Sequence, residues 1–120
     1  SSYFGKRTDP FTGKPANHTG IDFAGKHGDE IVAVADGVVT WSGDRYGSGV
    51  MVEINHGNGY STRYAHNSEN RVSVGDEVKK GQVVALMGKT GRATGPNLHF
   101  EVLREGRRVN PVSFIRESSK

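Results

Sequence analysis

The stretch Thr94-Gly-Pro-Asn97-Leu98-His99-Phe100-Glu101-Val102 joins a turn to a β-strand that carries a histidine close to its start. Glycine and proline form the turn, because glycine tolerates unusual backbone angles and proline pre-sets one of them. Outward from this stretch, short apolar runs are separated by glycine-containing turns along the chain. They predict extended segments over 18–23, 31–35, 38–41, 50–54, 60–64, 83–87, 98–104 and 107–109.

Many short strands, 17 glycines and only 33% hydrophobic residues favour an all-β fold over a helical bundle. We expect an antiparallel β-sandwich or partly open barrel, with a groove bordered by loops. Asp36-Gly37 is predicted to form a tight hairpin turn between the strands 31–35 and 38–41. The glycine-rich loops 43–49, 55–59 and 88–95 are predicted to border the groove, where glycine allows close approach of another backbone.

The 120 residues fit a single domain, 1–120. Within it, 1–17 is predicted to be a wrapped N-terminal segment, and 116–120 is predicted to be a frayed tail. Phe114 and Ile115 are expected to dock on the core. The sequence shows no signal peptide, so we expect a mature or excised domain.

Charge and composition limit the possible partners. The 16 basic and 13 acidic residues give a net charge of +3, which favours an anionic polymer without selecting one. No stretch interleaves basic and aromatic residues in a nucleic-acid motif, and no apolar run could span a membrane. We therefore expect neither a nucleic-acid partner nor a membrane span in this segment. The absence of cysteine excludes disulfides and thiolate metal ligands.

Histidines and a carboxylate from three places in the chain are candidates for one metal site. His18 and Asp22 are four residues apart, so on an extended segment they point to the same side. That pair alone is a weak signal, and a surface hydrogen bond would equally account for it. His66 and His99 lie at ends of predicted strands, where side chains can line a cleft. Histidine, carboxylate and histidine are the usual ligand types of a zinc site that keeps one position open for water.

The two remaining histidines lie in polar, glycine-containing loop segments. His27 lies in the run Gly25-Lys-His-Gly-Asp29 and is predicted to be a solvated loop residue. His56 lies in Asn55-His-Gly-Asn58, where a structural role, bonding its own loop, is expected.

Several short motifs occur in an order and at a spacing typical of one protein family. They are His18-Thr-Gly-Ile-Asp22, Ala33-Val-Ala-Asp-Gly-Val38, Asn55-His-Gly-Asn-Gly-Tyr60, Tyr64-Ala-His66, Val74-Gly-Asp-Glu-Val78 with Lys80-Gly-Gln82, and Gly91-Arg-Ala-Thr-Gly-Pro96 with Leu98-His-Phe-Glu101. From about residue 4 to residue 115, the chain resembles the lysostaphin-type (LytM, M23 family) zinc metallopeptidases, which cut peptidoglycan peptide bridges. The resemblance implies that His18, Asp22 and His99 hold one zinc ion per chain and that His66 is a catalytic histidine.

Position 97 departs from the family pattern. The family has histidine-x-histidine where this chain has Asn97-Leu98-His99. The second histidine, a ligand by the resemblance, is retained, whereas the first, a catalytic residue, is Asn97. Asparagine can donate or accept a hydrogen bond, but it cannot take up a proton near neutral pH as imidazole does. We therefore expect a complete metal site with reduced or abolished activity.

Three origins of Asn97 stay open. It is an introduced change that silences an enzyme, a natural residue in an enzyme that works with His66 and water, or a mark of a natural non-cutting relative. Because the three metal ligands are retained, long decay is disfavoured, and we favour an enzyme scaffold with impaired activity.

The resemblance also implies the substrate and the place of action. It points to an endopeptidase of peptidoglycan stem peptides and their cross-links, a cell-wall hydrolase of the secreted type. We expect the D-alanyl cross-link to a diamino acid rather than a glycine bridge, and the Gram-negative periplasm as the compartment. Zinc would polarise the scissile carbonyl and activate water, while His66 handles the proton.

Two alternatives belong to other classes. A non-catalytic module on the same fold would bind the cell wall or activate another hydrolase. Val74-Gly-Asp-Glu-Val-Lys-Lys-Gly-Gln82 resembles the hairpin signature of biotinyl or lipoyl carriers. We disfavour a carrier, because no turn of this chain offers the exposed lysine that such domains modify.

Overall fold

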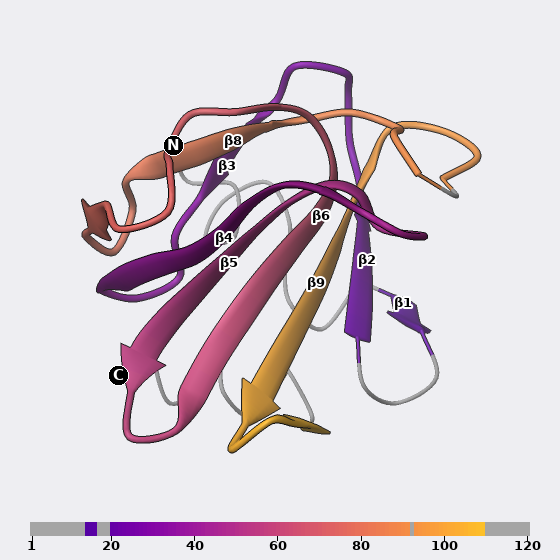
Figure 1. The fold of residues 1–120 in the computed structure, drawn as a ribbon. Coiled ribbons are helices and arrows are strands. Elements are labelled where there is room, and N and C mark those ends of the chain that lie inside the picture. Colours follow the sequence, from indigo (N-terminus) through magenta and orange to yellow (C-terminus); the bar gives the residue numbers. More distant parts are fainter. Residues whose placement is uncertain (1–13, 17–19, 92, 110–120) are drawn as a thin grey trace.

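The computed structural model describes residues 14–16, 20–91 and 93–109, and these residues form ten β-strands without a helix (Figure 1). Every pairing between these strands is antiparallel. The prediction of an all-β antiparallel fold is therefore confirmed. The strands are β1 (Lys14–Ala16), β2 (Gly20–Ala24), β3 (Glu30–Val32), β4 (Gly37–Arg45), β5 (Gly49–Gly57), β6 (Tyr60–Asn70), β7 (Glu77–Val78), β8 (Val83–Met87), β9 (Asn97–Arg104) and β10 (Arg107–Val109).

The main sheet has the strand order β1-β2-β9-β6-β5-β4-β7. Its long strands lie side by side in Figure 1, where β9 is orange-yellow and β6 is rose. The long strand β6 pairs with β5 on one side. On the other side its first half pairs with β9 and its last residues pair with β8. In turn, β8 pairs with β3, and this pair forms the second layer. Among the described strands the order ends at β1 and β7, so the sheet is not closed into a barrel.

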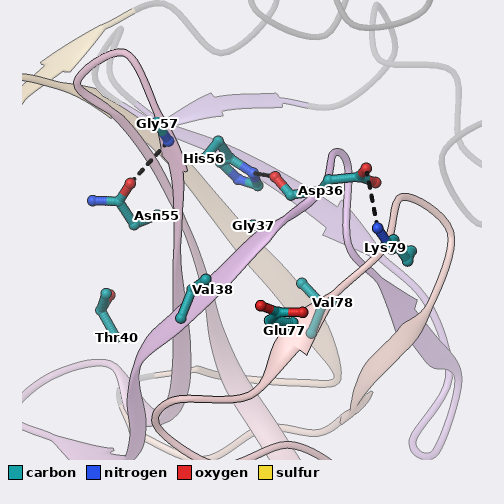
Figure 2. Close-up of a pocket in the computed structure, with 10 residues that line it drawn as sticks. All are labelled: Asp36, Gly37, Val38, Thr40, Asn55, His56, Gly57, Glu77, Val78 and Lys79. Atoms are coloured by element: carbon teal, nitrogen blue, oxygen red, sulfur yellow. Dashed lines mark hydrogen bonds and ion pairs between the residues drawn. The ribbon is translucent and has the colours of Figure 1, made fainter.

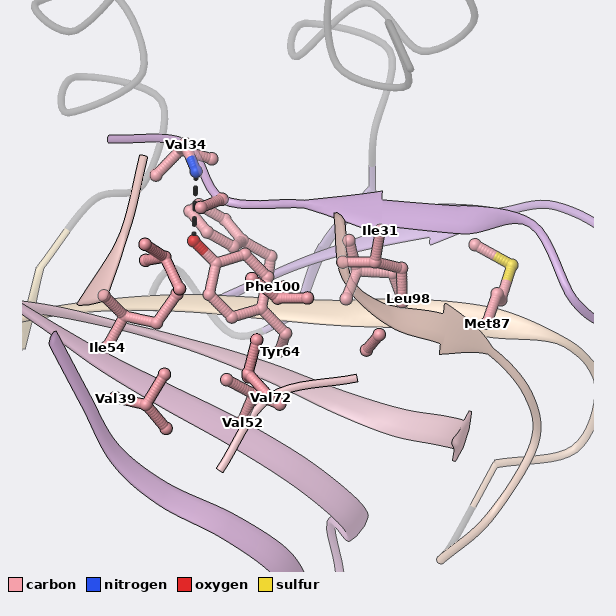
Figure 3. Packing of buried hydrophobic residues seen from close by; sticks show 14 of the residues in the cluster. Ile31, Val34, Val39, Val52, Ile54, Tyr64, Val72, Met87, Leu98 and Phe100 are labelled. Carbon is pink, nitrogen blue, oxygen red and sulfur yellow. Dashed lines mark hydrogen bonds between the residues drawn. The ribbon is translucent and has the colours of Figure 1, made fainter. Parts of the chain in front are cut away.

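The hydrophobic core lies between the main sheet and the β3–β8 layer (Figure 3). On the strands of the main sheet, buried and more exposed residues alternate, as the two-residue period of a strand requires. Tyr64 and Phe100 pack with their ring centroids 5.5 Å apart, and both side chains are fully buried. The Tyr64 hydroxyl also accepts a hydrogen bond from the Val34 backbone nitrogen at 3.2 Å. The alternate residues of these strands point to the opposite face of the sheet and are available for function.

The predicted hairpin at Asp36-Gly37 is wrong. β3 pairs with β8 rather than with β4, and β4 pairs with β5 and β7. The cause is visible in the bonds of this segment, because Ala33 exchanges backbone hydrogen bonds with Gly81 and Gln82. The Asp36 carboxylate accepts a bond from the Lys80 backbone nitrogen at 2.7 Å, which also ties the segment to the approach to β8.

Several other strands either match the segments predicted from the sequence or extend beyond them. Strands are present at 83–87 and 107–109 as predicted, whereas β5 continues to Gly57 and β6 continues past His66 to Asn70. The predicted N-terminal wrap at 1–17 lies outside the described residues except for β1. The predicted docking of Phe114 and Ile115 and the frayed tail also fall outside them. The described residues contain no helix with the length and hydropathy of a membrane span.

Candidate active site

Asp22 and His99 are brought together by strand pairing. They lie directly opposite each other in the register of β2 and β9, on the face of the sheet that points away from the core. Asp22 Oδ1 is 2.6 Å from His99 Nδ1. The histidine side chain is 22% exposed and the aspartate side chain 47% exposed, so the pair is partly accessible to solvent. The two expected ligands that the structure describes thus meet at one point.

Gly20 makes room for the His99 imidazole. A Cβ at Gly20 would lie 2.7 Å from His99 Cε1 and 2.9 Å from Nε2, distances that side-chain carbons do not show. The ring therefore occupies space that any other residue at position 20 would fill. This cradle fixes the ring with its Nδ1 edge toward Asp22.

Glu101 contacts the other nitrogen of the same ring. Glu101 Oε2 is 3.0 Å from His99 Nε2, and this hydrogen bond raises the pKa of His99, with burial opposing and Asp22 adding to the effect. Burial alone would raise the pKa of Glu101, but the bond to His99 and the nearby charges of Arg108 and Arg63 outweigh burial and lower it. His99 is therefore held between two carboxylates.

His66 lies at an irregularity of β6 beside this pair. Two residues of β6, Ala65 and His66, lie opposite the single residue Met51 of β5, which makes a β-bulge. His66 has a φ of 69°, a left-handed conformation that non-glycine residues seldom adopt and that is found at functional sites. The bulge directs the imidazole to a position 6.1 Å from the His99 ring, measured between centroids.

Two backbone carbonyls hold His66 in this conformation. Its backbone nitrogen donates to Ser48 O at 2.9 Å, and its Nδ1 lies 2.7 Å from Thr90 O. Because a carbonyl oxygen only accepts, Nδ1 carries the proton of the neutral ring. The lone pair is then on Nε2, which is the nitrogen able to accept a proton.

The loops that supply these carbonyls are locked to each other. Thr90 Oγ1 accepts from the Val50 backbone nitrogen at 3.0 Å and donates to Asn67 O at 2.7 Å. A Cβ at Gly49 would lie 2.5 Å from the Gly91 nitrogen, so the two glycines pack backbone against backbone. Residues 48–49 and 90–91 of the predicted loops 43–49 and 88–95 thus lie beside the site, whereas Gly43 to Arg45 belong to β4.

The third predicted border loop, 55–59, lies elsewhere. Tyr60, next to this loop, is five residues along β6 from Ala65, which pairs with His99. Five residues of a strand span roughly 17 Å at about 3.4 Å per residue. This loop instead lines a separate, open pocket of about 630 Å³ (Figure 2). Its lining includes Asp36, Thr40, Asn55, His56, Glu77 and Lys79.

His56 has a structural role, as expected, but its ring nitrogens bond Asp36 and Thr62 rather than its own loop; Figure 2 shows its contact with the Asp36 carbonyl. His56 Nδ1 is 2.7 Å from Asp36 O, and Nε2 is 2.7 Å from Thr62 Oγ1. These bonds connect the β5–β6 hairpin to the start of β4 and to the core. His27 is exposed, as predicted for a solvated loop.

Asn97 lies two residues before His99 on β9, so both side chains leave the same face of the strand. Asn97 Nδ2 donates to Gly95 O at 3.0 Å. Its Oδ1 is buried and has no hydrogen-bond partner among the described residues. A buried polar atom without a partner is costly, and it marks a position where a bound group can donate a hydrogen bond.

His18 lies outside the described residues, and among those that are described no three histidine, cysteine or acidic side chains form a metal-binding group. The donors that are described nevertheless fit zinc. A carboxylate oxygen and an imidazole nitrogen are zinc ligands, and here they converge from neighbouring strands, with the far nitrogen of the imidazole bonded to a second carboxylate.

Sequence reasoning missed several contributors to this site, among them Gly20, Thr90 and Glu101. Glu101 has a recognisable signal, because it follows His99 by two residues on a strand and so shares its face. Gly20 and Thr90 have none, because their roles depend on which distant residues the fold places beside them.

The chain is similar in sequence and in fold to known proteins. The model of peptidase family M23 matches residues 16–111. The DD-carboxypeptidase/endopeptidase Mpg of Neisseria meningitidis is 46% identical over 113 residues, which cover 94% of this chain and 26% of that protein. The chain therefore belongs to peptidase family M23.

Two further matches cover most of the chain. The murein hydrolase activator NlpD of Salmonella dublin is 40% identical over 92% of this chain and 29% of that protein. The crystal structure of a zinc-containing peptidase from Vibrio cholerae is 42% identical, with a TM-score of 0.76, over 86% of this chain and 32% of that one. The chain thus spans roughly a quarter to a third of the length of these relatives.

Proposed function

We propose that this domain is a zinc-dependent endopeptidase of peptidoglycan peptide cross-links, with an activity that Asn97 reduces. The observation that carries the proposal is the 2.6 Å approach of Asp22 Oδ1 and His99 Nδ1, with the His66 ring beside them. Membership of family M23 and the DD-carboxypeptidase/endopeptidase relative support the reaction class.

The proposed zinc ligands are His18, Asp22 and His99, one ion per chain. The zinc-containing relative supports the choice of metal. Bound there, zinc would polarise the scissile carbonyl and lower the pKa of water that attacks it. Asp22 and His99 contribute by holding their donor atoms on neighbouring strands, where the sheet fixes their separation.

His66 is proposed to handle the proton. With Nδ1 bonded to the Thr90 carbonyl, Nε2 is free to accept a proton from attacking water and then to return it to the leaving amine. The bulge and the two carbonyl contacts hold the ring in one orientation, so that little reorganisation is needed during the reaction.

Asn97 supplies a hydrogen-bond acceptor where the family has a second imidazole. Its unpartnered Oδ1 can orient water or a substrate N–H, but it cannot remove a proton. The loss of one general acid–base partner typically lowers a rate by roughly a hundred- to ten-thousandfold. The proposed consequence is a domain that binds metal and substrate and turns over slowly.

The proposed substrate is the peptide portion of peptidoglycan, in particular the D-alanyl cross-link, and the proposed compartment is the Gram-negative periplasm. Both are supported by relatives in Neisseria, Vibrio and Salmonella, which are named as DD-endopeptidases or as a murein hydrolase activator.

A second candidate is a non-catalytic domain that activates another cell-wall hydrolase. Asn97 favours it, because the substitution removes an acid–base group and leaves the rest of the site in place. The similarity to NlpD, named as a murein hydrolase activator, supports it as well.

Replacement of Asn97 by histidine tests both candidates. The Asn97→His variant and the unchanged chain are incubated with purified cross-linked muropeptides, and the products are separated by chromatography. Asn97→His with His66→Ala serves as the control. We expect Asn97→His to cleave the muropeptides and the unchanged chain to cleave them at least roughly a hundredfold more slowly. The control should cleave them little.

Equal, robust cleavage by the unchanged chain and by Asn97→His would overturn the role assigned to position 97. If neither cleaves although both bind zinc, the activating function is the better description.

A further inference from the structure

A row of charged side chains crosses the site face of the main sheet. Glu101 Oε2 bonds His99 Nε2, and Glu101 Oε1 lies 3.6 Å from Arg63 Nη1 and 3.5 Å from Arg108 Nε. Arg63 Nε lies 2.7 Å from Glu53 Oε2. The row therefore starts at the candidate metal ligand and continues over β9, β6 and β5.

Strand register produces this row. Glu101 pairs directly with Arg63 across β9 and β6, and Arg63 pairs directly with Glu53 across β6 and β5. Directly opposed side chains on one face are close enough to interact, so the acid–base–acid order is built into the sheet. The side chains of Glu101, Glu53 and Arg63 are only 13%, 19% and 20% exposed.

The partial burial separates this row from ordinary surface ion pairs. The pair of Arg71 and Glu69 on the same molecule is 52% and 56% exposed, and such pairs contribute little. The two carboxylate oxygens of Glu101, by contrast, contact different groups. One contacts the histidine, and the other faces the sheltered Arg63, which holds the carboxylate in place, and the half-exposed Arg108.

We infer that Glu101 is a positioning residue for His99: its carboxylate accepts the Nε2 hydrogen and thereby directs Nδ1, with its lone pair, toward the metal position beside Asp22. Arg63 fixes the carboxylate, with the half-exposed Arg108 beside it, and Gly20 leaves the space in which the ring is held. Histidine ligands whose second nitrogen donates to a carboxylate bind metal more strongly and in a defined orientation. The inference rests on the proposed zinc function, and it adds the residue that orients one ligand.

Zinc affinity of the purified chain provides the first test. Zinc is titrated against a competing chelator into the metal-free unchanged chain, Glu101→Ala, Glu101→Gln and Glu69→Ala. Loss of a carboxylate that supports a ligand typically weakens metal binding roughly ten- to a hundredfold, and we expect this for Glu101→Ala. Glu101→Gln keeps an acceptor oxygen without the charge, so its zinc affinity should lie between those of the unchanged chain and Glu101→Ala. Glu69→Ala, which removes a carboxylate from an exposed pair, should bind as the unchanged chain does.

A spectroscopic measurement separates positioning from a general loss of stability. In the zinc-loaded, ¹⁵N-histidine-labelled protein, the Nε2 hydrogen of His99 should be visible by NMR because it is hydrogen-bonded and exchanges slowly with water. In Glu101→Ala this resonance should be lost through exchange, and Glu101→Gln should restore part of it. Urea denaturation of each variant shows whether it is folded under the conditions of the titration.

The outcomes distinguish this inference from the proposed function. If the unchanged chain takes up no zinc, the zinc function fails and the positioning role fails with it. If the unchanged chain binds zinc and folded Glu101→Ala binds it equally well with the His99 resonance unaltered, only the positioning role is overturned.

Discussion

His66 Nδ1 lies 2.7 Å from the carbonyl oxygen of Thr90, a residue 24 positions later in the chain. This contact connects the bulge in β6 to the segment that precedes β9. The Thr90 hydroxyl completes the connection, because it bonds both Val50 N and Asn67 O. The orientation of the proposed proton carrier therefore depends on one threonine that does not itself contact the candidate ligands.

Substitution of Thr90 by valine should loosen this connection. Valine has nearly the same shape but offers neither hydrogen bond, and the loss of a net hydrogen bond costs about 1 kcal/mol. In the Asn97→His background we expect cleavage of muropeptides to fall while zinc affinity stays unchanged. Thr90→Ser, which keeps the hydroxyl, is the matched control. A Thr90→Val variant that cleaves as fast as the control would show that the threonine does not orient His66.

The backbone contact between Gly49 and Gly91 predicts a stability effect. A Cβ at Gly91 would lie 2.5 Å from the Gly49 nitrogen, and Gly91 also has a φ of 75°. Gly81 has a φ of 87° but open space around the Cβ position. Alanine in the left-handed region costs roughly 1–2 kcal/mol at either site, and only Gly91→Ala adds an overlap. Urea denaturation should show the larger loss of unfolding free energy for Gly91→Ala, and equal losses would contradict the described packing of the two loops.

Gly20 offers a direct way to move His99. Its backbone is not in the left-handed region, so Gly20→Ala adds a Cβ against the imidazole without strain in φ. We expect a marked loss of zinc affinity, because the ring must shift to avoid the overlap. Gly95→Ala, where the Cβ meets nothing within 4 Å, should bind zinc normally. Unchanged affinity in Gly20→Ala would argue that His99 is not held where the structure has it.

A second histidine has a role in stability and predicts a pH dependence. His56 Nδ1 donates to the Asp36 carbonyl, so in the neutral ring Nε2 accepts from Thr62 Oγ1, which lies 2.8 Å from the Tyr64 hydroxyl. Burial lowers the pKa of His56, with the Asp36 carbonyl and charge opposing. Burial also raises the pKa of Tyr64 to about 12, so this hydroxyl stays protonated.

The sign of the pH effect follows from the lowered pKa. The unfolded chain binds a proton at the ordinary value of 6.5, whereas folded His56 binds it only at lower pH. The contribution of His56 to stability is therefore present above pH 6.5 and falls as the pH drops through 6.5 toward the folded pKa. The raised pKa of His99 acts in the opposite direction in the metal-free protein, so the two must be separated. Asp36 and its partner Lys79 are the charged groups beside His56, and Glu77 lines the same pocket.

The contributions of His56 and His99 are separated by denaturation of the metal-free unchanged chain and of His56→Gln between about pH 5 and 8. Glutamine does not titrate, so the difference in unfolding free energy between the two proteins should shrink as the pH falls below 6.5. A difference that is constant over this range would show that His56 binds protons equally well in the folded and unfolded states.

Much of the fold could be predicted from local pattern, but its pairing could not. Strands at 83–87 and 107–109 were recognisable because each is a short run of residues that favour strands, with turn-forming residues before and after it. The partner of β3 was not, because Asp36-Gly37 has the composition of a tight turn. The course of this segment depends instead on the backbone bonds of Ala33 to Gly81 and Gln82, which are far away along the chain. Such long-range choices leave no mark in the residues that flank a turn.

The same division applies to the site. Asp22 and His99 could be proposed as partners because their types and motifs are those of zinc ligands, and the structure brings them to 2.6 Å. The bulge at His66 could not be foreseen, since it depends on a mismatch between β5 and β6. The groups that hold the imidazoles, Thr90 for His66 and Gly20 for His99, act through a backbone carbonyl and a missing Cβ. Neither feature depends on a characteristic side chain.

The most direct test of a metal centre built on Asp22 and His99 is the zinc content of the purified protein. Elemental analysis is carried out after dialysis against zinc and removal of the excess, on the unchanged chain and on folded Asp22→Ala and His99→Ala. We predict one zinc per chain in the unchanged protein and a large loss in both variants. No zinc in the unchanged chain, or one zinc retained in both variants, would contradict a metal centre at this position.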